Sequence, residues 1–223
     1  MEILSLGIIH MKPIFHKSFV SAISLLFALT ISVFAQNSSL GIFKDHSDIG
    51  NPELAGYVKY NSENDEYVIE GSGYNIWFER DEFHYLWRKI KKDFILKVRI
   101  EFIGEVVEPH RKIGWMIRND LSSTSPHVSA VVHGDGLTSL QYRRADGTQT
   151  EEVISEDLSP DIIQLERSGN NYFMSTASGN NPFKTVKVEN IDLNDKVFVG
   201  LFVCSHNPDI IEKAYFRHVK ITR

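Results

Sequence analysis

Residues 112–118 read KIGWMIR, and residues 127–143 read HVSAVVHGDGLTSLQYR. Successive side chains of an extended strand point to opposite faces, so the first run places Trp115 and its isoleucine neighbours on one face. Lys112 and Arg118 then share the other face. The second run predicts two strands joined by a tight Gly-Asp-Gly turn. We therefore predict three neighbouring strands with one apolar face and one partly polar face.

Four polar side chains of these strands are expected to converge on one sheet surface, and they are Arg118, His133, Gln141 and Arg143. Charged groups in the middle of a strand cost free energy unless they are paired or face solvent. They therefore mark either a wet concave face that binds a polar ligand or an internal ion pair, for which Glu166 is a candidate partner. Arg and Gln, flanked by aromatic rings, suit the hydroxyls and apolar C–H patches of a sugar.

The rest of the chain predicts short strands separated by turn residues about every ten positions. No window shows sustained helical periodicity of apolar residues. The further predicted strands are Gly41–Asp48, Gly56–Tyr60, Glu66–Glu70, Asn75–Phe78, Phe83–Arg88, Phe94–Phe102, Gln149–Ile154, Asp161–Arg167, Asn171–Ala177, Lys184–Val188, Val197–Cys204 and Ala214–Thr222. About a dozen such strands in one flat sheet would expose a large apolar face, so the prediction is all-β, a two-sheet antiparallel jelly-roll sandwich.

Composition limits the classes of partner. The chain has 223 residues, a formal net charge of -5, 42% apolar residues and 24% charged residues, which is ordinary for one globular domain. The charge gives no electrostatic reason to expect nucleic acid as a partner. The lone Cys204 allows no internal disulfide and no cysteine metal site, and its apolar neighbours predict a buried side chain. We expect a monomer that requires no cofactor.

The N-terminal region, residues 1–35, is predicted to be a signal peptide. A basic region around Lys12 precedes the apolar run Phe19–Phe34, and the residues before the predicted cleavage site after Ala35 suit signal peptidase. Met11 begins a more conventional signal than Met1 and is the alternative start. The mature sandwich domain is then residues 36–223, secreted or periplasmic, with no membrane insertion after cleavage.

Several runs carry a family resemblance, and they are Asp48–Gly50, Gly71–Trp77, Asp81–Tyr85 and Lys112–Arg118. In these runs the chain resembles the concanavalin A-like lectin/glucanase sandwich domains of the DUF1349-like group. It is also similar to domains appended to TolB-like β-propeller proteins of Bacteroidetes, through residues 132–136 and 204–206. The resemblance implies a two-sheet jelly roll and a link to carbohydrate.

Glucanases of this fold use a pattern close to Glu-x-Asp-x-x-Glu, because strand alternation sends the carboxylates to one concave face. Glu79 and Asp81 supply the first two carboxylates, but His84 occupies the position of the third. Retaining glycosidase action of that type is therefore disfavoured. Asp81 is predicted instead to cap a turn or to pair with a nearby arginine.

Histidines and aromatic residues supply the other candidates. His127, His133 and His206 lie at or near predicted strand ends, where with Asp135 they could bind a divalent metal or transfer a proton. No tight ligand spacing supports the metal, and a structural hydrogen-bonding role is the alternative for each histidine. A Gly-Ser-Gly turn precedes Tyr74 and Trp77, which makes one of these rings the candidate stacking platform.

A structural calcium is a further expectation. Asp45, Asp48 and Asn51 could offer oxygen ligands near the mature N-terminus, although their spacing is unlike that of an EF-hand.

The favoured hypothesis is an exported domain that binds a glycan or a glycan-derived small molecule on its concave face. The candidate ligand-binding residues are Arg118, His127, His133, Asp135, Gln141, Arg143, His206, Trp77 and Tyr74. The alternative is a sugar-active enzyme of the 3-keto-glycoside lyase or hydrolase kind, with His133 as base and Arg143 or Arg118 stabilising an enolate. A third hypothesis is an envelope scaffold that binds another protein.

Overall fold

The computed structural model describes residues 40–223, and the predicted signal peptide lies outside the described residues. Within these residues, all of the regular secondary structure is β-strand. The strands are β1 (Asp45–Ile49), β2 (Tyr57–Asn61), β3 (Glu66–Gly71), β4 (Ile76–Trp77), β5 (Arg80–Asp81), β6 (Phe83–Lys91), β7 (Phe94–Ile103), β8 (Lys112–Arg118), β9 (His127–His133), β10 (Thr138–Arg143), β11 (Glu151–Ile154), β12 (Ile162–Ser168), β13 (Asn171–Ala177), β14 (Lys184–Val188), β15 (Lys196–Cys204) and β16 (Glu212–Thr222). Within the described part of the chain, no helix is long and apolar enough to cross a membrane.

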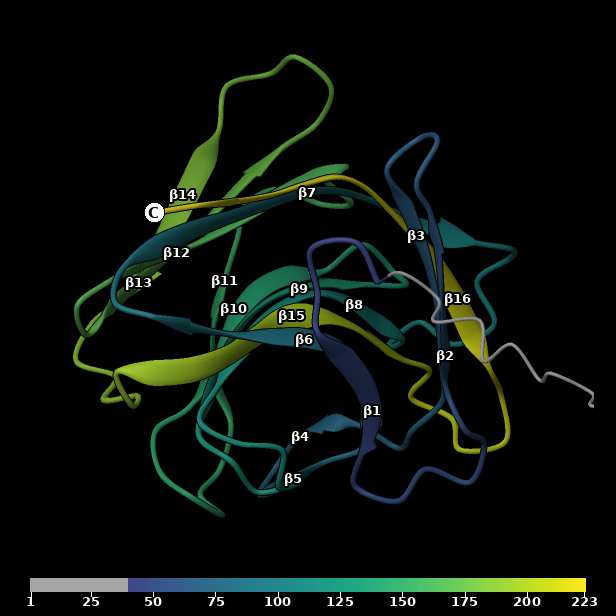
Figure 1. The fold of residues 1–223 in the computed structure, drawn as a ribbon, viewed down its shortest axis with the longest axis horizontal. Helices are drawn as coiled ribbons and strands as arrows, with labels where there is room; N and C mark the ends of the chain where they lie inside the picture. Colours follow the sequence, from purple (N-terminus) through teal and green to yellow (C-terminus); the bar gives the residue numbers. More distant parts are fainter. Residues whose placement is uncertain (1–39) are drawn as a thin grey trace, which may run out of the picture. The chain divides into compact units, whose positions relative to one another are not determined.

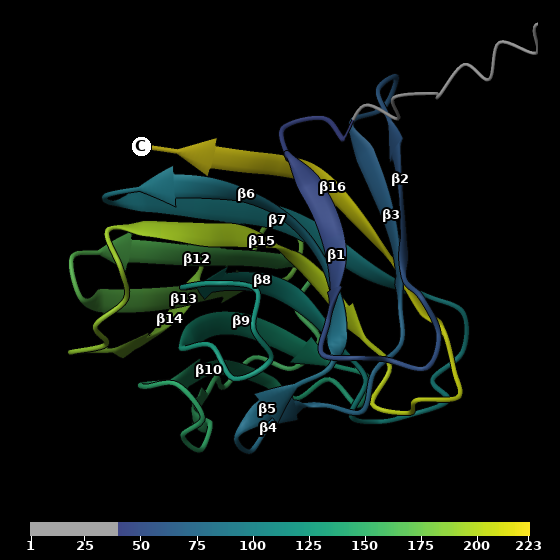
Figure 2. The ribbon, with the colours of Figure 1, turned by 60° about the horizontal axis from the view of Figure 1, so that its bottom comes forward.

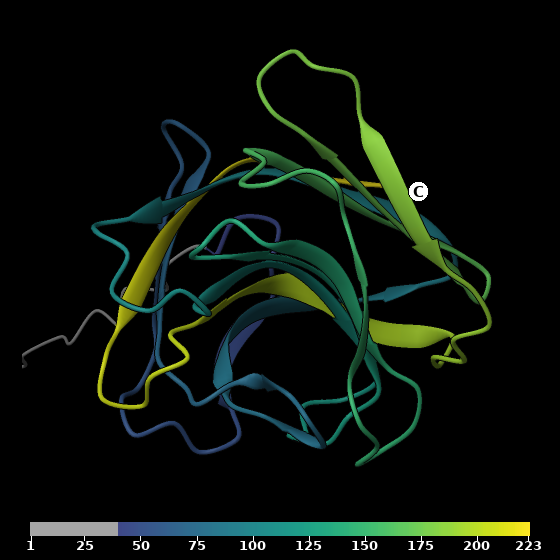
Figure 3. The ribbon, with the colours of Figure 1, turned by 180° about the vertical axis from the view of Figure 1, so that it is seen from behind.

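The strands form two large antiparallel sheets (Figures 1 and 3). Sheet A has the order β1-β6-β15-β8-β9-β10-β11, and sheet B has the order β14-β13-β12-β7-β16-β3-β2. Neighbours such as β6 and β15 are distant in sequence, which is typical of jelly-roll connections. The predicted two-sheet antiparallel jelly-roll sandwich is confirmed.

The main hydrophobic core lies between the two sheets. Trp115 and the flanking isoleucines of β8 are fully buried there against apolar residues of sheet B such as Leu96 and Leu165. Fully burying one large aliphatic side chain contributes about 1.5–3 kcal/mol before the entropy of ordering it. The apolar face predicted from the alternation in residues 112–118 is therefore the inner face of sheet A.

The other face of sheet A is also covered at its centre. β8, β9 and β10 are buried along their whole length, on both faces. Sheet A arches over a small hairpin made by β4 and β5, which lies in its hollow on the side away from sheet B (Figures 1 and 2). A second apolar cluster forms beneath sheet A, with Ile76 of β4 packed among residues such as Phe83, Met116 and Phe202. Cys204 belongs to this cluster, and burial raises its pKa to about 11, so the prediction of a buried thiol is confirmed.

Strand register separates the polar side chains of the hollow into two groups. Lys112 pairs with His133 at one end of β8. Arg118 pairs with His127 at the other end, and His127 in turn pairs with Arg143 of β10. Lys112 and Arg118 are six residue steps apart along β8, a distance of roughly 20 Å. The polar residues share one face of sheet A as predicted, but they lie at opposite ends of it.

Candidate functional site

Arg118 and Arg143 are sealed beneath the surface by Asp81 of β5. All three side chains are fully buried. Arg143 donates to the two carboxylate oxygens of Asp81 at 2.7 and 2.9 Å, and Arg118 Nη2 lies 3.5 Å from the same carboxylate. Other guanidinium N–H groups donate to backbone carbonyls, including those of Asp120 and Phe78, and Arg118 Nη1 lies 3.5 Å from Met116 Sδ. We call these three residues the Asp81 cluster.

The prediction that Arg118 and Arg143 open into a ligand pocket is wrong. Their charges are satisfied internally, which is the cheaper way to keep a mid-strand guanidinium in a covered sheet. The alternative of an internal ion pair is confirmed, with Asp81 as the partner and not Glu166. The prediction that Asp81 pairs with a nearby arginine is confirmed as well.

His127 lies in the same buried row and cannot contact a ligand from solvent. Its side chain is fully buried, and Nδ1 lies 3.0 Å from Ser129 Oγ. Burial, followed by the positive charges of Arg143 and Arg118, holds its pKa well below the ordinary histidine value. The predicted ligand role of His127 is therefore wrong, and its structural role is favoured.

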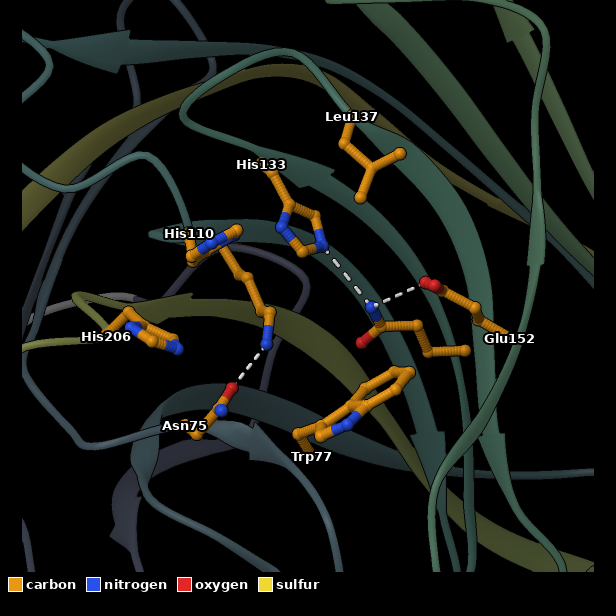
Figure 4. Close-up of a pocket in the computed structure, with 9 residues that line it drawn as sticks. Asn75, Trp77, His110, His133, Leu137, Glu152 and His206 are labelled. Carbon is orange, nitrogen blue, oxygen red and sulfur yellow. Dashed lines mark hydrogen bonds between the residues drawn. The ribbon is translucent and has the colours of Figure 1, made fainter.

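The opposite end of the hollow holds a cavity of about 270 Å³. Sheet A contributes four neighbouring strands to it, the β4–β5 hairpin contributes one wall, and two connecting loops contribute the rim (Figure 4). The lining residues are Asn75, Trp77, His110, Lys112, His133, Leu137, Gln141, Glu152 and His206. Of the predicted ligand-binding residues, the structure brings together His133, Gln141, His206 and Trp77.

A hydrogen-bonded chain crosses the floor of this cavity from Glu152 to His133 (Figure 4). The Gln141 amide nitrogen lies 3.4 Å from Glu152 Oε2 and 3.3 Å from His133 Nε2. The same nitrogen lies 3.2 Å from Ser139 Oγ, so its two N–H donors serve three contacts. We assign one donor to the Glu152 carboxylate and one to His133, which makes His133 Nε2 the acceptor and places the ring proton on Nδ1.

His133 is a neutral hydrogen-bond donor held without a partner. Burial, reinforced by the nearby charge of Lys112, lowers its pKa to about 3. Among the described residues, no group accepts a hydrogen bond from His133 Nδ1, and Gln141 Oε1 is also buried without a partner. Buried polar atoms in this state cost about 1–3 kcal/mol each, which a bound polar ligand recovers.

Lys112 is the buried lysine of the cavity, with 3% of its surface exposed. Its Nζ donates to Asn75 Oδ1 and, at 3.2 Å, to the Ile76 carbonyl, both of which are neutral. The Trp77 ring lies 5.9 Å from Nζ. Burial lowers the pKa of Lys112, against the attraction of Cys204, Asp81 and Glu152.

Two histidines and a tyrosine form the rim. The His206 ring lies 5.3 Å from the ring of His110 and 6.3 Å from that of Tyr74, on which it stacks. Burial, and then the charge of Lys112, lowers the pKa of His206. Tyr74 is half exposed and contacts the rim through His206, so the candidate platform inside the cavity is Trp77.

Asp135 does not line the cavity. It is exposed, and its carboxylate accepts a hydrogen bond from the amide of Leu137 within the turn. The predicted ligand role of Asp135 is therefore replaced by a turn-stabilising role. No group of three or more His, Cys, Asp or Glu residues in the described range 40–223 is arranged to hold a metal ion.

The proposed calcium ligands are engaged in other contacts. Asp48 accepts hydrogen bonds from the Gly56 amide and lies 2.7 Å from His84 Nδ1, and Asp45 accepts from the amide of His46. The structural calcium stays a prediction.

Five lining residues escaped the sequence analysis as site residues, and they are Asn75, His110, Lys112, Leu137 and Glu152. Lys112 carried a usable signal, because it alternates onto the same face as Arg118. The others arrive from the hairpin, a loop, a turn and an edge strand, whose placement depends on the tertiary fold.

No protein-family model matches the sequence, and no curated protein matches it. Among solved structures, the chain is similar to a functionally unknown protein from Saccharomyces cerevisiae, with 16% identity, a TM-score of 0.59 and coverage of 79% of this chain and 95% of that one. It is also similar to the carbohydrate-binding module CBM66 from Bacillus subtilis, with 12% identity, a TM-score of 0.51 and coverage of 82% and 98%. A family 7 alginate lyase, A1-II′, matches with 11% identity, a TM-score of 0.48 and coverage of 74% and 83%.

The first two likenesses show the fold, a concanavalin A-like β-sandwich, which confirms the coarser part of the predicted resemblance. The placement in the DUF1349-like group and the Bacteroidetes context stay predictions. The chain therefore has the fold of this sandwich class.

Replacement of Asp81 by asparagine is expected to destabilise the fold. Two buried guanidinium groups would lose their counter-charge, which costs about 3–5 kcal/mol in the free energy of unfolding. The exposed Glu79 of the same hairpin supplies a matched control, since Glu79→Gln should change stability by about 0.5 kcal/mol or less. Urea denaturation measures both. Equal losses from the two variants would contradict the role of the Asp81 cluster.

The free energy of unfolding is also expected to decrease as the pH is lowered, because of His127. Its pKa in the folded state is depressed, so the unfolded chain binds more protons below about pH 6.5, and the stability present above that pH is lost as the pH falls. Between about pH 6.5 and pH 5 this loss is about 2 kcal/mol for one histidine that stays neutral. The variant His127→Phe should lose about 2 kcal/mol less over that range in urea denaturation. An unchanged pH dependence in the variant would argue against this assignment.

Proposed function

We propose that the protein binds carbohydrate in the cavity between the β4–β5 hairpin and sheet A. The observation that carries the proposal is the pair of buried, unpartnered polar atoms, His133 Nδ1 and Gln141 Oε1, on the floor of a cavity walled by the Trp77 ring. A sugar ring has hydroxyls to satisfy such atoms and an apolar C–H face to lie against an indole.

The dimensions support a small ligand. The cavity of about 270 Å³ lies just below the range of roughly 300–1,000 Å³ usual for drug-sized ligands. It suits one sugar ring, such as a monosaccharide or the terminal unit of a glycan. Glu152 offers a further hydrogen-bonding carboxylate at the β11 side of this space.

Binding is favoured over the alternative of a histidine-base lyase. A general base works best with a pKa near the operating pH, whereas the pKa of His133 is lowered to about 3. The cationic partner suggested for it, Arg143, is sealed in the Asp81 cluster. The fold shared with the carbohydrate-binding module from Bacillus subtilis is compatible with the proposal, but the cavity residues carry it.

A glycan array screened with the mature protein, followed by calorimetry on the sugars retained, tests the proposal. We expect Trp77→Ala and Gln141→Leu to weaken binding about tenfold or more, because the first removes the apolar wall and the second leaves buried partners unsatisfied. Lys59→Met, a change at an exposed lysine of sheet B, is the control and should leave the affinity unchanged. Sugar binding that survives both cavity variants would place the ligand elsewhere and overturn the proposal.

We also propose that the protein is exported after removal of residues 1–35, on the strength of the basic and apolar segments that precede Ala35. The expected mature N-terminus is Gln36. Mass spectrometry of the protein recovered from the exported fraction of a bacterial host tests this. A chain that keeps residues 1–35, or that stays in the cytoplasm, would contradict it.

A further inference from the structure

The strongest unexplained feature of the cavity is a buried cation with no counter-ion. Lys112 is almost fully buried, and both of its side-chain hydrogen bonds go to neutral oxygens, those of Asn75 and the Ile76 backbone. Among residues 40–223, no carboxylate lies within ion-pair distance of its Nζ. A buried ammonium without an anionic partner is costly, so such a group pairs with an anion, binds one as a ligand, or loses its proton.

The contrast with the other end of the same strand is informative. Arg118 lies on the same face of β8 and has the carboxylate of Asp81 within reach. The chain thus supplies a counter-ion to the cation that is sealed, and none to the cation that lines a cavity. Lys112 has two hydrogen-bond partners and three N–H donors, which leaves one donor for a ligand.

His133 supplies a second donor next to Lys112. The two residues are direct partners in the β8–β9 register, so their Cα atoms lie about 4.5–5.5 Å apart and their side chains share a face. Both line the cavity, and His133 Nδ1 carries a buried proton without an acceptor. The third N–H of Lys112 and the N–H of His133 Nδ1 are two neighbouring donors, which match the two oxygens of a carboxylate.

The rest of the lining gives the cavity a charge polarity. Glu152 is its one acidic residue among the nine that line it, and it is held by the Gln141 amide on the side of β11. Oxygens at that end accept hydrogen bonds from sugar hydroxyls, whereas Lys112 and His133 offer only donors at the other end. The arrangement therefore suits a ring with an acidic group on one side and hydroxyls on the other.

We infer that the ligand is a carboxylated sugar of the hexuronate class, whose carboxylate accepts hydrogen bonds from Lys112 Nζ and His133 Nδ1. The inference rests on the proposed function, because it names the class of sugar that the same cavity binds. Trp77 lies against the ring face, and Glu152 accepts from a hydroxyl remote from the carboxylate.

Calorimetry with the wild-type mature protein is the first test, because it needs no variant. The probes are glucuronate, galacturonate, mannuronate and guluronate, each compared with its methyl ester and with the corresponding neutral hexose. We expect at least one uronate to bind about tenfold or more tightly than its ester and its hexose, since charge-assisted hydrogen bonds are lost in both. Glucose 6-phosphate and glucose 6-sulfate test whether another anion is preferred.

Variants then assign the preference to the two donors. Lys112→Met should abolish the preference for uronate over hexose, Lys112→Arg should retain most of it, and Lys59→Met should leave it intact. His133→Phe, which keeps an aromatic ring and removes the donor, should reduce the preference by about tenfold. Unfolding midpoints of all four variants show whether each is folded.

These experiments distinguish failure of the uronate inference from failure of the carbohydrate-binding proposal. Equal affinity for uronate, ester and hexose overturns the inference and leaves the carbohydrate-binding proposal standing. A preference for the phosphate or sulfate ester over every uronate also overturns the inference. If calorimetry shows no binding of any of these sugars and the glycan array also retains none, both the inference and the carbohydrate-binding proposal are overturned.

Discussion

The ion pairs between Asp81, Arg118 and Arg143 determine what the concave side of sheet A can do. They fix the β4–β5 hairpin beneath the sheet, since Asp81 belongs to the hairpin and both arginines belong to the sheet. A fully buried ion pair offsets its desolvation cost only with good geometry and further hydrogen bonds, and here backbone carbonyls supply several of them. The cluster therefore acts as a specific attachment that holds the hairpin in one position.

The position of the hairpin creates the cavity. β5 carries Asp81 into the Asp81 cluster and closes that part of the hollow, while Trp77 of β4 and the preceding Asn75 form a wall of the cavity. The strands of sheet A supply Lys112, His133 and Gln141 opposite this wall. The same strands thus differ between their two ends: the charges of Arg118 and Arg143 are paired internally at one end, and at the other end His133 Nδ1 and Gln141 Oε1 line a cavity without partners.

The sequence predicted the sandwich well because its signals are local and repeated. Alternation in residues 112–118 identified the inner face correctly, and Gly-rich turns such as the one after His133 gave the strand boundaries. It predicted the site in part. His133, Gln141, His206 and Trp77 do line one cavity, but strand parity shows which face a residue lies on and not what covers that face. Parity alone therefore could not decide whether Arg118 and Arg143 bind a ligand or form an internal ion pair, because their partner Asp81 comes from a hairpin whose placement is a long-range property of the fold.

The central claim is that a sugar carboxylate replaces the counter-ion that Lys112 lacks. A crystal structure of the mature protein with its tightest-binding uronate tests it most directly. The account predicts the sugar ring beside Trp77, with one carboxylate oxygen about 3 Å from Lys112 Nζ, another near His133 Nδ1, and the Asp81 cluster unchanged. A sugar bound outside the cavity, or one whose carboxylate points away from Lys112, would contradict it.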